Sequence, residues 1–547
     1  MIFTPARIVI VLILGWTGVA NAAVPLSGVV DELRQRLQIS DETQTLRAAG
    51  IALQQPVALV QFYDQRAYEP AWLDTDGLLP PADALLKTVA NAGREGLRAT
   101  DYHHNEISKA LDAIRVEPVA SIQQWADLDL LLTDTWLTYA SHLLSGRLSP
   151  QKVDPQWTIK PRSRDLAAML KEALEKNDVT AALDALSPTN TAYVRLRTAL
   201  ADYRELEKKG GWTRISPGPT LAKGVRHPRV KEVRARLRVT GELVKGTTDT
   251  RGAEDLFDEG LRQAVRRFQQ RHGLPDNGAV GAETLAELNV PVSQRMRQIA
   301  VNMERWRWLP DDLGQRYILV NIPDFSMSVV EGSQRVLDAK VIVGKSVLQT
   351  PVFTANMSYL VLSPRWNVPQ TIAVKDKLPE LRRDAYALAR QNIRIYNQGK
   401  NEIDPRSVDW NTVSINNFPY RLRQDPGPRN ALGKVKFMFP NPYNVYLHDT
   451  PSHDLFNRSQ RTFSHGCIRI SKPIELAEYL LKGDQRWTRD AILTASTSGR
   501  ERIVQLPEEV PVHIVYWTAW VAEDGAVNFR NDIYERDKPL LRRLYSI

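Results

Sequence analysis

Residues 463–470 read FSHGCIRI and contain the only cysteine of the 547-residue chain. Cys467 follows a histidine and a glycine and stands directly before the alternating β-formers Ile468 and Ile470, which predict a strand. A single cysteine cannot form a disulfide within its own chain. It is therefore either a small buried apolar residue or a thiol whose thiolate does chemistry.

A second predicted strand lies upstream of the cysteine. Residues 444–449, NVYLHD, carry β-formers and end near His448, and a loop joins them to Cys467. Two strand ends joined by such a loop can lie side by side, which would bring imidazole and thiol together as base and nucleophile. An unperturbed thiol has a pKa of about 8.5, so only a few per cent is thiolate at neutral pH. A neighbouring imidazole can take that proton, and each unit by which the thiol pKa falls favours the thiolate by about 1.4 kcal/mol.

Residues next to the cysteine add to this chemistry. Gly466 allows a tight turn and leaves room for a substrate at the sulfur. The backbone N–H groups of Gly466 and Cys467 are candidates for stabilising an oxyanion. Strand alternation places Arg469 on the same face as Cys467, where it can supply positive charge.

The N-terminal sequence predicts export. Arg7, the apolar run 8–20 and the motif Ala20-Asn21-Ala22 have the order of a signal peptide, which we place at residues 1–22; an uncleaved membrane anchor is the alternative. No later segment has the length and apolarity of a membrane span. The mature protein is expected outside the cytoplasm, where one unpaired cysteine suggests a reactive thiol.

Net charge is +9, which fits an anionic partner such as the cell wall without specifying one. No pattern in the sequence favours a nucleic-acid partner. Periodicity and turn residues divide the rest of the chain into a helical domain, a three-helix domain, a connecting helix, a strand-rich domain with an insert, and a C-terminal strand with an extension. The corresponding ranges are 24–215, 222–291, 292–315, 316–500 with its insert at 370–432, and 501–547.

The three-helix segment resembles a known wall-directed module. GLPDNGAVG, at 273–281, is followed by Thr284, and the whole is similar to the small peptidoglycan-binding domain. An unrelated three-helix spacer is the alternative. The residues expected to form its core are Val230, Val233, Leu237, Leu261, Val265, Phe268, Thr284, Leu285 and Leu288.

Residues 448–470, HDTPSHDLFNRSQRTFSHGCIRI, resemble the active-site signature of the L,D-transpeptidases, whose core is the YkuD domain. VGKSVLQTPVF (343–353), SPRWNVP (363–369) and GKVKFMFPN (433–441) match further blocks of the large subgroup of this family. The resemblance implies a multidomain α+β protein. It would have a helical N-terminal scaffold domain, a three-helix peptidoglycan-binding domain and a mixed β-sandwich catalytic domain with a helical capping insert.

The resemblance also implies a reaction that needs no cofactor. Cys467 would attack the amide between the third residue of a donor stem tetrapeptide and its terminal D-Ala, which leaves. The resulting thioester would be resolved by the side-chain amine of a second stem peptide, giving a 3→3 peptidoglycan cross-link in the periplasm, an activity of cell wall organisation and cell shape. Carbapenems are expected to acylate the same thiol.

Individual roles follow from the resemblance. His448 would serve as base and then acid, and Asp449 would orient it through its backbone carbonyl, although the wider family often has glycine at that position. Ser464 and His465 would shape the loop. Tyr446, Trp366 and Asn367 would line the donor cleft; core packing is an equally good interpretation of Trp366. The insert would be a lid over this cleft.

Two other classes of function are considered. A zinc-dependent wall peptidase could use His448, His453 and His465, yet no H-E-x-x-H motif is present, and S-H-G-C-I-R is then unexplained, so no metal site is expected. A non-catalytic wall-binding protein would not need Cys467, His448 and Arg469 intact. The sequence leaves open whether the acceptor is a stem peptide, a protein to be anchored or water, as in an L,D-carboxypeptidase.

Overall fold

The computed structural model describes residues 24–38, 45–116, 120–155, 157–244, 254–414 and 416–545, so the predicted signal peptide lies outside the described residues. Packing divides the chain into two units. The first comprises the chain up to Gly93, Leu97–Leu144 and Arg164–Ser187, and the second comprises Arg94–Gly96, Ser145–Ser163 and Pro188–Ile547.

The first unit is helical around one long central helix, α5. Leu128, Leu131, Leu132 and Trp136 recur at helical spacing along α5 and are fully buried, which explains why this helix forms the centre of the unit. The helices are α1 (Leu26–Leu37), α2 (Pro56–Asp64), α3 (Pro80–Ala90), α4 (His104–Val116), α5 (Ile122–Ser145), α7 (Leu166–Glu175) and α8 (Val179–Asp184), with two short hairpins, β1–β2 (Arg47–Ala48, Ile51–Ala52) and β3–β4 (Leu73–Asp74, Gly77–Leu78).

Three short helices in the second unit form a separate small core. They are α10 (Arg229–Val239), α11 (Glu259–Arg271) and α12 (Ala282–Leu288). The apolar faces predicted for them are confirmed: Val230, Val233 and Leu237 pack against Leu261 and its α11 neighbours with almost no exposure. The sequence therefore predicted this element of the fold correctly.

The second unit is built on a large mixed sheet in the order β14-β7-β15-β13-β12-β8-β16-β5-β6. β6 also pairs with β7, so the strands from β7 to β6 in this order form a closed ring of pairings. β7 makes this possible because its first part pairs with β6 and its last residues pair with β15. The bounds are β5 (Arg316–Asn321), β6 (Ser326–Glu331), β7 (Gln334–Gly344), β8 (Phe353–Leu362), β12 (Val435–Met438), β13 (Leu447–His448), β14 (Thr462–Ser464), β15 (Ile468–Ile470) and β16 (Arg502–Val515).

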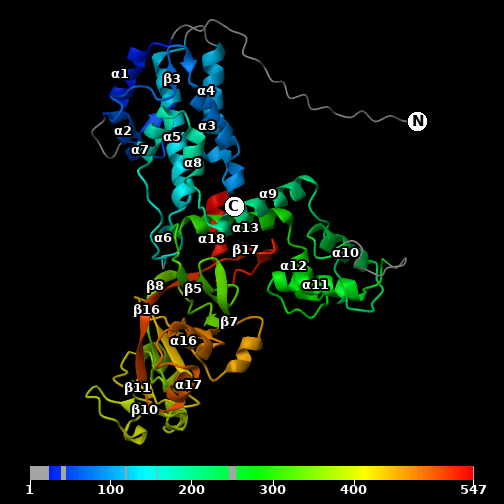
Figure 1. Cartoon of the computed structure of the whole chain (residues 1–547), viewed down its shortest axis with the longest axis vertical. Helices are drawn as coiled ribbons and strands as arrows, with labels where there is room; N and C mark the ends of the chain where they lie inside the picture. The colour runs from blue at the N-terminus through cyan, green and yellow to red at the C-terminus, as the bar shows by residue number, and fades with distance from the viewer. Residues whose placement is uncertain are drawn as a thin grey trace. The chain divides into compact units, whose positions relative to one another are not determined.

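Strand β16 corrects the boundary predicted at residue 500. It lies between β8 and β5, antiparallel to the first and parallel to the second, so residues 502–515 complete the sheet and do not begin a separate extension. Figure 1 shows this orange strand among green strands that come much earlier in the chain. The local sequence predicted a strand but did not indicate its partners, because pairing of this kind joins residues far apart in the sequence.

Other helices and a short hairpin of the second unit contribute to the same apolar core as the sheet. They are α9 (Thr191–Lys208), α13 (Val292–Arg307), α16 (Pro473–Leu480), α17 (Arg489–Thr497), α18 (Asp537–Tyr545), the single turn α6 (Pro150–Val153) and the hairpin β17–β18 (Ala519–Val521, Val527–Phe529). On α13, Ile299, Met303 and Trp306 are buried, and Met296 is partly buried against the same core.

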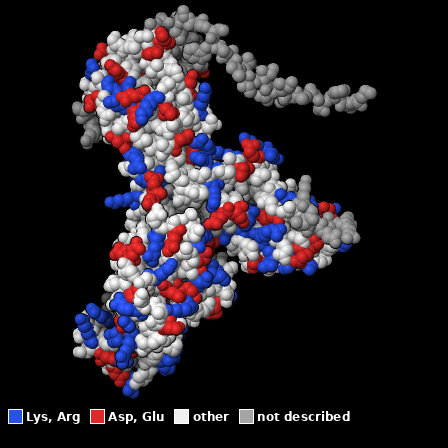
Figure 2. All heavy atoms as spheres, in the orientation of Figure 1, with Lys and Arg blue, Asp and Glu red and all other residues white. Residues whose placement is uncertain are grey.

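The insert, residues 370–432, has its own apolar core and a three-stranded sheet in the order β10-β11-β9. Its elements are α14 (Gln370–Ile372), a π-turn (Ala373–Lys377), α15 (Leu378–Arg383), β10 (Ile393–Tyr396) and β11 (Arg421–Gln424), with β9 (Trp366–Asn367) just before it. The resemblance implied a helical insert, but α15 ends early, at Arg383, because the Asp384 carboxylate accepts the N–H of Tyr386 and turns the chain. Lys and Arg side chains gather over this end of the unit in Figure 2.

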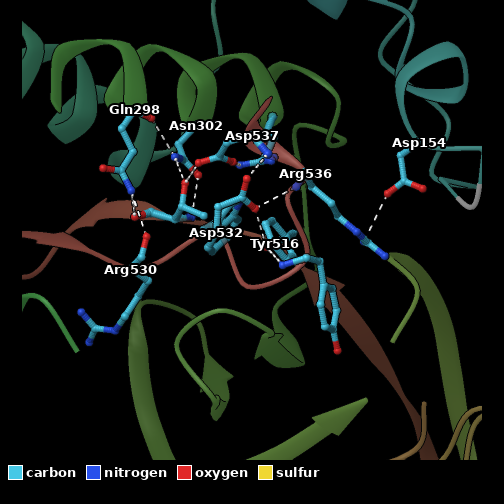
Figure 3. A network of polar contacts seen from close by, with 12 residues as sticks. Asp154, Gln298, Asn302, Tyr516, Arg530, Asp532, Arg536 and Asp537 are labelled. Carbon is cyan, nitrogen blue, oxygen red and sulfur yellow. Dashed lines mark hydrogen bonds and ion pairs between the residues drawn. The ribbon is translucent and has the colours of Figure 1, made fainter. Parts of the chain in front are cut away.

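The C-terminal segment, residues 516–545, is held against the rest of the second unit by a buried polar network. Asn302 on α13 donates to Thr518 Oγ1 at 2.9 Å, and that hydroxyl donates to the Asp537 carboxylate at 2.6 Å. Asp532 accepts the Tyr516 hydroxyl at 2.6 Å and the N–H of Asp537 at 2.8 Å, as Figure 3 shows. These bonds satisfy polar groups that would be costly to bury alone.

Candidate active site

The strand register brings the nucleophile and base candidates to one face. β13 and β15 run parallel, with Leu447 opposite Ile468 and His448 opposite Arg469, so the predicted side-by-side placement of the two strands is confirmed. Because side chains alternate along a strand, Tyr446, His448, Cys467 and Arg469 share a face. All four line one cavity of about 810 Å³.

The loop before the cysteine is shaped by Ser464. Its hydroxyl donates to the carbonyl of Cys467 at 2.5 Å and accepts the N–H of Gly466 at 3.1 Å. Gly466 has φ +111°, a conformation that side chains disfavour. The predicted oxyanion role of Gly466 therefore needs correction for this conformation, since its N–H is already engaged; the Cys467 N–H remains the candidate.

A second hydroxyl holds the same loop from the other side. Thr350 Oγ1 donates to the carbonyl of Gly466 at 2.9 Å and accepts the N–H of Gly344 at 3.0 Å. Thr350 is fully buried. The backbone around Cys467 is thus held by the hydroxyls of Ser464 and Thr350, and sequence analysis named only Ser464.

The Cys467 thiol is half-buried and touches Tyr446. Its sulfur lies 3.8 Å from the carbonyl oxygen of Asn444. Burial raises the pKa of the thiol, while hydrogen bonds from Tyr446 and the charges of Lys436 and Arg469 act to lower it. The pKa of the thiol is raised overall in this conformation, because desolvation of the thiolate is the largest influence.

The His448 ring is buried and held in one tautomer. Its Nδ1 lies 2.5 Å from the backbone oxygen of Asp449. A carbonyl can only accept, so Nδ1–H donates and the neutral ring carries its lone pair on Nε2. Burial, and after it the Arg469 guanidinium, lower the pKa of His448 to about 3. The ring is therefore a neutral imidazole at physiological pH.

The Asp449 carboxylate faces away from that ring. Its Oδ2 accepts the N–H of Lys434 at 2.8 Å, and Oδ1 lies 3.4 Å from His453. Gly433 has φ +61°, and a Cβ there would lie 2.4 Å from the carboxyl carbon of Asp449. Only glycine leaves room for this carboxylate, so the chain places the carbonyl and not the carboxylate against the imidazole.

The insert forms the opposite wall of the cavity. Trp366 and Asn367, the two residues proposed for the donor cleft, line this cavity from β9. Asp376 on the π-turn lies 3.0 Å from Nε2 of His465, the residue two before the nucleophile. The insert thus touches the nucleophile loop directly, and Trp366 packs against the insert core as well as facing the cavity.

The three histidines that a zinc site would need hold separate partners. His448 pairs with the Asp449 carbonyl, His453 with the Asp449 carboxylate and His465 with Asp376. Within the described ranges, no group of three or more His, Cys, Asp or Glu side chains is arranged to hold a metal ion. The same ranges contain no helix that combines the length and apolarity needed to cross a bilayer.

Comparison with protein-family models identifies three regions. Residues 315–490 match the L,D-transpeptidase catalytic domain, YkuD. Residues 57–200 match a scaffold domain, and residues 226–288 match a peptidoglycan binding domain. The chain carries an L,D-transpeptidase catalytic domain. The resemblance found in the sequence is confirmed, and domains that act on the cell wall imply an exported protein.

A curated relative supports the same assignment. A Haemophilus influenzae protein named as an L,D-transpeptidase is 36% identical over 244 residues, which are 45% of this chain. The chain spans about half of that relative, since 49% of its length is matched. A solved L,D-transpeptidase from Stackebrandtia nassauensis is 13% identical and covers 55% of this chain and 97% of its own, with a TM-score of 0.21. Another from Xylanimonas cellulosilytica is 12% identical and covers 55% of this chain and 99% of its own, with a TM-score of 0.17.

Within the L,D-transpeptidase domain, sequence analysis missed Lys436, as it missed the charged residues Asp376, Lys377 and Glu380 that the insert adds to the cavity wall. Lys436 on β12 pairs with His448 in the sheet register and lines the cavity. The signal was present: alternation along VKFM turns Val435 and Phe437 into the core and Lys436 to the other face, with His448. It went unused because lysine in a strand usually indicates a solvent-exposed face.

Proposed function

We propose that this protein is a periplasmic L,D-transpeptidase that forms 3→3 cross-links in peptidoglycan through a thioester on Cys467. The observation that carries the proposal is the placement of a lone thiol in one cavity with an imidazole whose Nδ1 is held by the Asp449 carbonyl. This leaves Nε2 as the only basic atom of the ring. The family match over residues 315–490 supports the same chemistry.

In the first half-reaction the thiol attacks the carbonyl carbon between the third residue and the terminal D-Ala of the donor. Nε2 of His448 takes the thiol proton as the sulfur–carbon bond forms. The carbon–nitrogen bond then breaks, the imidazolium returns its proton to the departing amine, and free D-Ala leaves. The product is a thioester, and the base has recovered its neutral form.

In the second half-reaction a side-chain amine of another stem peptide attacks the thioester carbonyl. The amine loses a proton to His448, a new amide forms, and the sulfur leaves and takes the proton back. The N–H of Cys467 is the proposed donor to the oxyanion in both halves. Tyr446, Trp366 and Asn367 are the proposed donor-binding residues, and the insert is the proposed lid.

The proposal is tested with purified tetrapeptide muropeptides and the full-length protein. Mass spectrometry should detect an enzyme adduct of a tripeptide acyl group and a cross-linked product that has lost one D-Ala. A tripeptide product with no cross-link would indicate hydrolysis, and transfer to a protein amine would indicate anchoring. Activity that survives thiol alkylation and is abolished by a chelator would instead support a zinc peptidase.

A further inference from the structure

The candidate active-site cavity carries two positive charges that have no acidic partner in contact. Among the described residues, no ion pair joins Lys436 or Arg469 to a carboxylate, and Nε of Arg469 is buried without a hydrogen-bond partner. Glu501 acts on Lys436 only through its field, and its own carboxylate is held by Arg365. Unpaired charges withdrawn from water are costly, which points to a ligand of opposite sign.

The other charged groups of the cavity wall have contacts of their own. Asp376 lies 3.0 Å from Nε2 of His465; burial lowers the pKa of that ring, so the ring is neutral and Asp376 keeps its negative charge beside His465. Glu380 accepts from Lys377 at 2.9 Å. The positive field of the cavity therefore comes from Lys436 and Arg469, which approach it from β12 and β15 on either side of β13.

Both cations lie close to the reacting sulfur. Each acts to stabilise the negative charge of Cys467. The ammonium of Lys436 stands 4.0 Å from the ring centroid of Tyr446, whose hydroxyl contacts the thiol. A ligand anion that meets these cations must therefore lie beside the bond under attack and not at the far end of the donor.

The donor chemistry offers one anion at that position, an argument that rests on the proposed function. The residue released from the donor ends in an α-carboxylate, and this group is one carbon removed from the nitrogen of the scissile amide. Neighbouring residues along a peptide are about 3.8 Å apart, so this carboxylate stays within a few ångströms of the sulfur. Two cations then balance two negative charges, the developing thiolate and the carboxylate.

We propose that Lys436 and Arg469 form a subsite for the α-carboxylate of the residue that follows the scissile amide. The subsite recognises donors in which a single residue follows the bond that is cut. A donor extended by one more residue presents a neutral amide at this position and leaves both cations unpaired. Donor length is thereby selected by charge.

The test compares two synthetic tetrapeptides that differ only in a free or an amidated C-terminus. Both give the same acyl-enzyme, so mass spectrometry of the full-length protein follows one product and the rates report the leaving group alone. A hydrogen bond to a charged group contributes about 1.5–3 kcal/mol, so the wild type should acylate roughly 10–100-fold faster with the free acid. In Lys436→Met this ratio should fall to about threefold or less.

Matched variants distinguish the effect of the Lys436 charge on the ratio of rates from an effect on folding. Lys434→Met removes the same charge from an exposed position two residues away and outside the cavity, and should keep the wild-type ratio. Lys436→Arg keeps the charge and should retain most of the wild-type ratio of rates. Thermal unfolding establishes that each variant is folded, and the wild-type comparison stands without any variant.

Equal wild-type rates with the two donors would overturn the subsite while leaving the proposed function intact. A wild-type ratio that Lys436→Met leaves unchanged would also overturn it. A further pair of donors has a third residue chosen to carry a side-chain carboxylate, free in one peptide and amidated in the other. If Lys436→Met loses discrimination between these two donors and keeps its discrimination between the C-terminal forms, the assignment is overturned. No acyl-enzyme with any donor would count against the proposed function itself.

Discussion

At the residue scale, the resting thiol and imidazole are both neutral. Burial raises the pKa of Cys467, and burial together with Arg469 lowers the pKa of His448 to about 3. A preformed thiolate–imidazolium pair is disfavoured by both shifts. In the proposed mechanism the sulfur therefore loses its proton as it attacks, with His448 as general base in the transition state.

Replacing Cys467 with serine should abolish acylation without unfolding the protein. Serine differs by one atom in a half-buried position, but its hydroxyl is a far weaker nucleophile than a thiol. Intact-protein mass spectrometry with a carbapenem and with a donor tetrapeptide should show one adduct on the wild type and none on Cys467→Ser. A carbapenem adduct that persists in the variant would place the nucleophile elsewhere.

His448→Ala and Asp449→Asn should differ greatly. Removing the imidazole removes the base, whose assistance is typically worth about 10²–10⁴-fold in rate. Asp449→Asn keeps the backbone carbonyl that holds Nδ1, and its side-chain oxygen can still accept the Lys434 N–H, so acylation should fall only a few-fold. If the two variants lost activity equally while folded, the Asp449 carboxylate would itself be the third catalytic group.

The buried His448 ring should make the protein sensitive to acid. In the unfolded chain a histidine titrates near pH 6.5, whereas the native ring titrates near 3, so only the unfolded state gains a proton between these values. The stability that the neutral ring contributes is complete above pH 6.5 and is lost as the pH falls toward 3. At pH 5 the loss is about 2 kcal/mol.

Thermal unfolding of wild type and His448→Gln at pH 7 and pH 5 measures this contribution. The wild type should lose more stability on acidification, because the variant lacks the titrating ring. Other buried groups with shifted pKa values, such as His272 and Asp129, are common to both proteins and cancel in the comparison. Parallel losses in the two proteins would show that His448 titrates normally.

Residue identity was predictable where chemistry requires a particular side chain. Cys467 and His448 stand out in the sequence because few other residues can supply a nucleophile and a base. The engagement of the Gly466 N–H by Ser464 was not predictable, since it depends on one side-chain rotamer. Lys436 shows the converse: its type and strand position were visible in the sequence, but the cavity that it lines is completed by the insert, whose placement was not.

At the element scale, the loop 344–350 connects the C-terminal segment to the nucleophile. Tyr534 donates to the Gly344 carbonyl at 2.5 Å, and Arg536 contacts Gln349 at 3.0 Å. Thr350, the last residue of this loop, donates its hydroxyl to the Gly466 carbonyl. The C-terminal segment is therefore part of the scaffold that holds the reactive backbone.

Thr350→Val should impair acylation more than stability alone explains. Valine has the same shape but leaves the Gly466 carbonyl and the Gly344 N–H without partners, each at a cost of about 1–3 kcal/mol. The loop should relax, and the acylation rate at saturating donor should fall about tenfold or more while KM changes little.

Thr354→Val is the matched control for this experiment. It removes a hydroxyl that bonds His513 in the same sheet, away from the cavity. The control should lose stability yet acylate at the wild-type rate per folded molecule. Equal rates for the two variants would show that Thr350 has no positioning role.

Elements were predictable from local pattern and their partners were not. The strand ending in His448 and the three helices of 222–291 follow from apolar spacing and turn residues. The neighbours of β16 and the early end of α15 follow from contacts outside the local window: distant strands in one case, and a side-chain bond to the backbone of Tyr386 in the other.

At the scale of the whole molecule, the peptidoglycan-binding domain packs on the catalytic unit. Arg271 donates to the carbonyl of Val527 at 2.9 Å, Arg530 donates to the carbonyl of Arg271 at 2.8 Å, and the His272 ring stacks on Phe529. A domain that served only to bind wall would not need this interface. Its removal should therefore lower the unfolding temperature as well as any affinity for the wall.

Replacing residues 222–291 with a Gly/Ser linker should reduce binding to insoluble sacculi more than turnover of soluble muropeptides. None of the described residues of this domain lines the active-site cavity, so a small donor should still reach Cys467 at a rate within a few-fold of wild type per folded molecule. Co-sedimentation with sacculi and mass spectrometry of soluble products measure the two effects. Phe529→Ala is the matched control, because it weakens the same interface while keeping the domain, and it should lose stability but not sacculus binding. If the linker variant sedimented with sacculi as fully as the wild type, the domain would be a structural spacer and the wall contact would lie in the catalytic or scaffold domain.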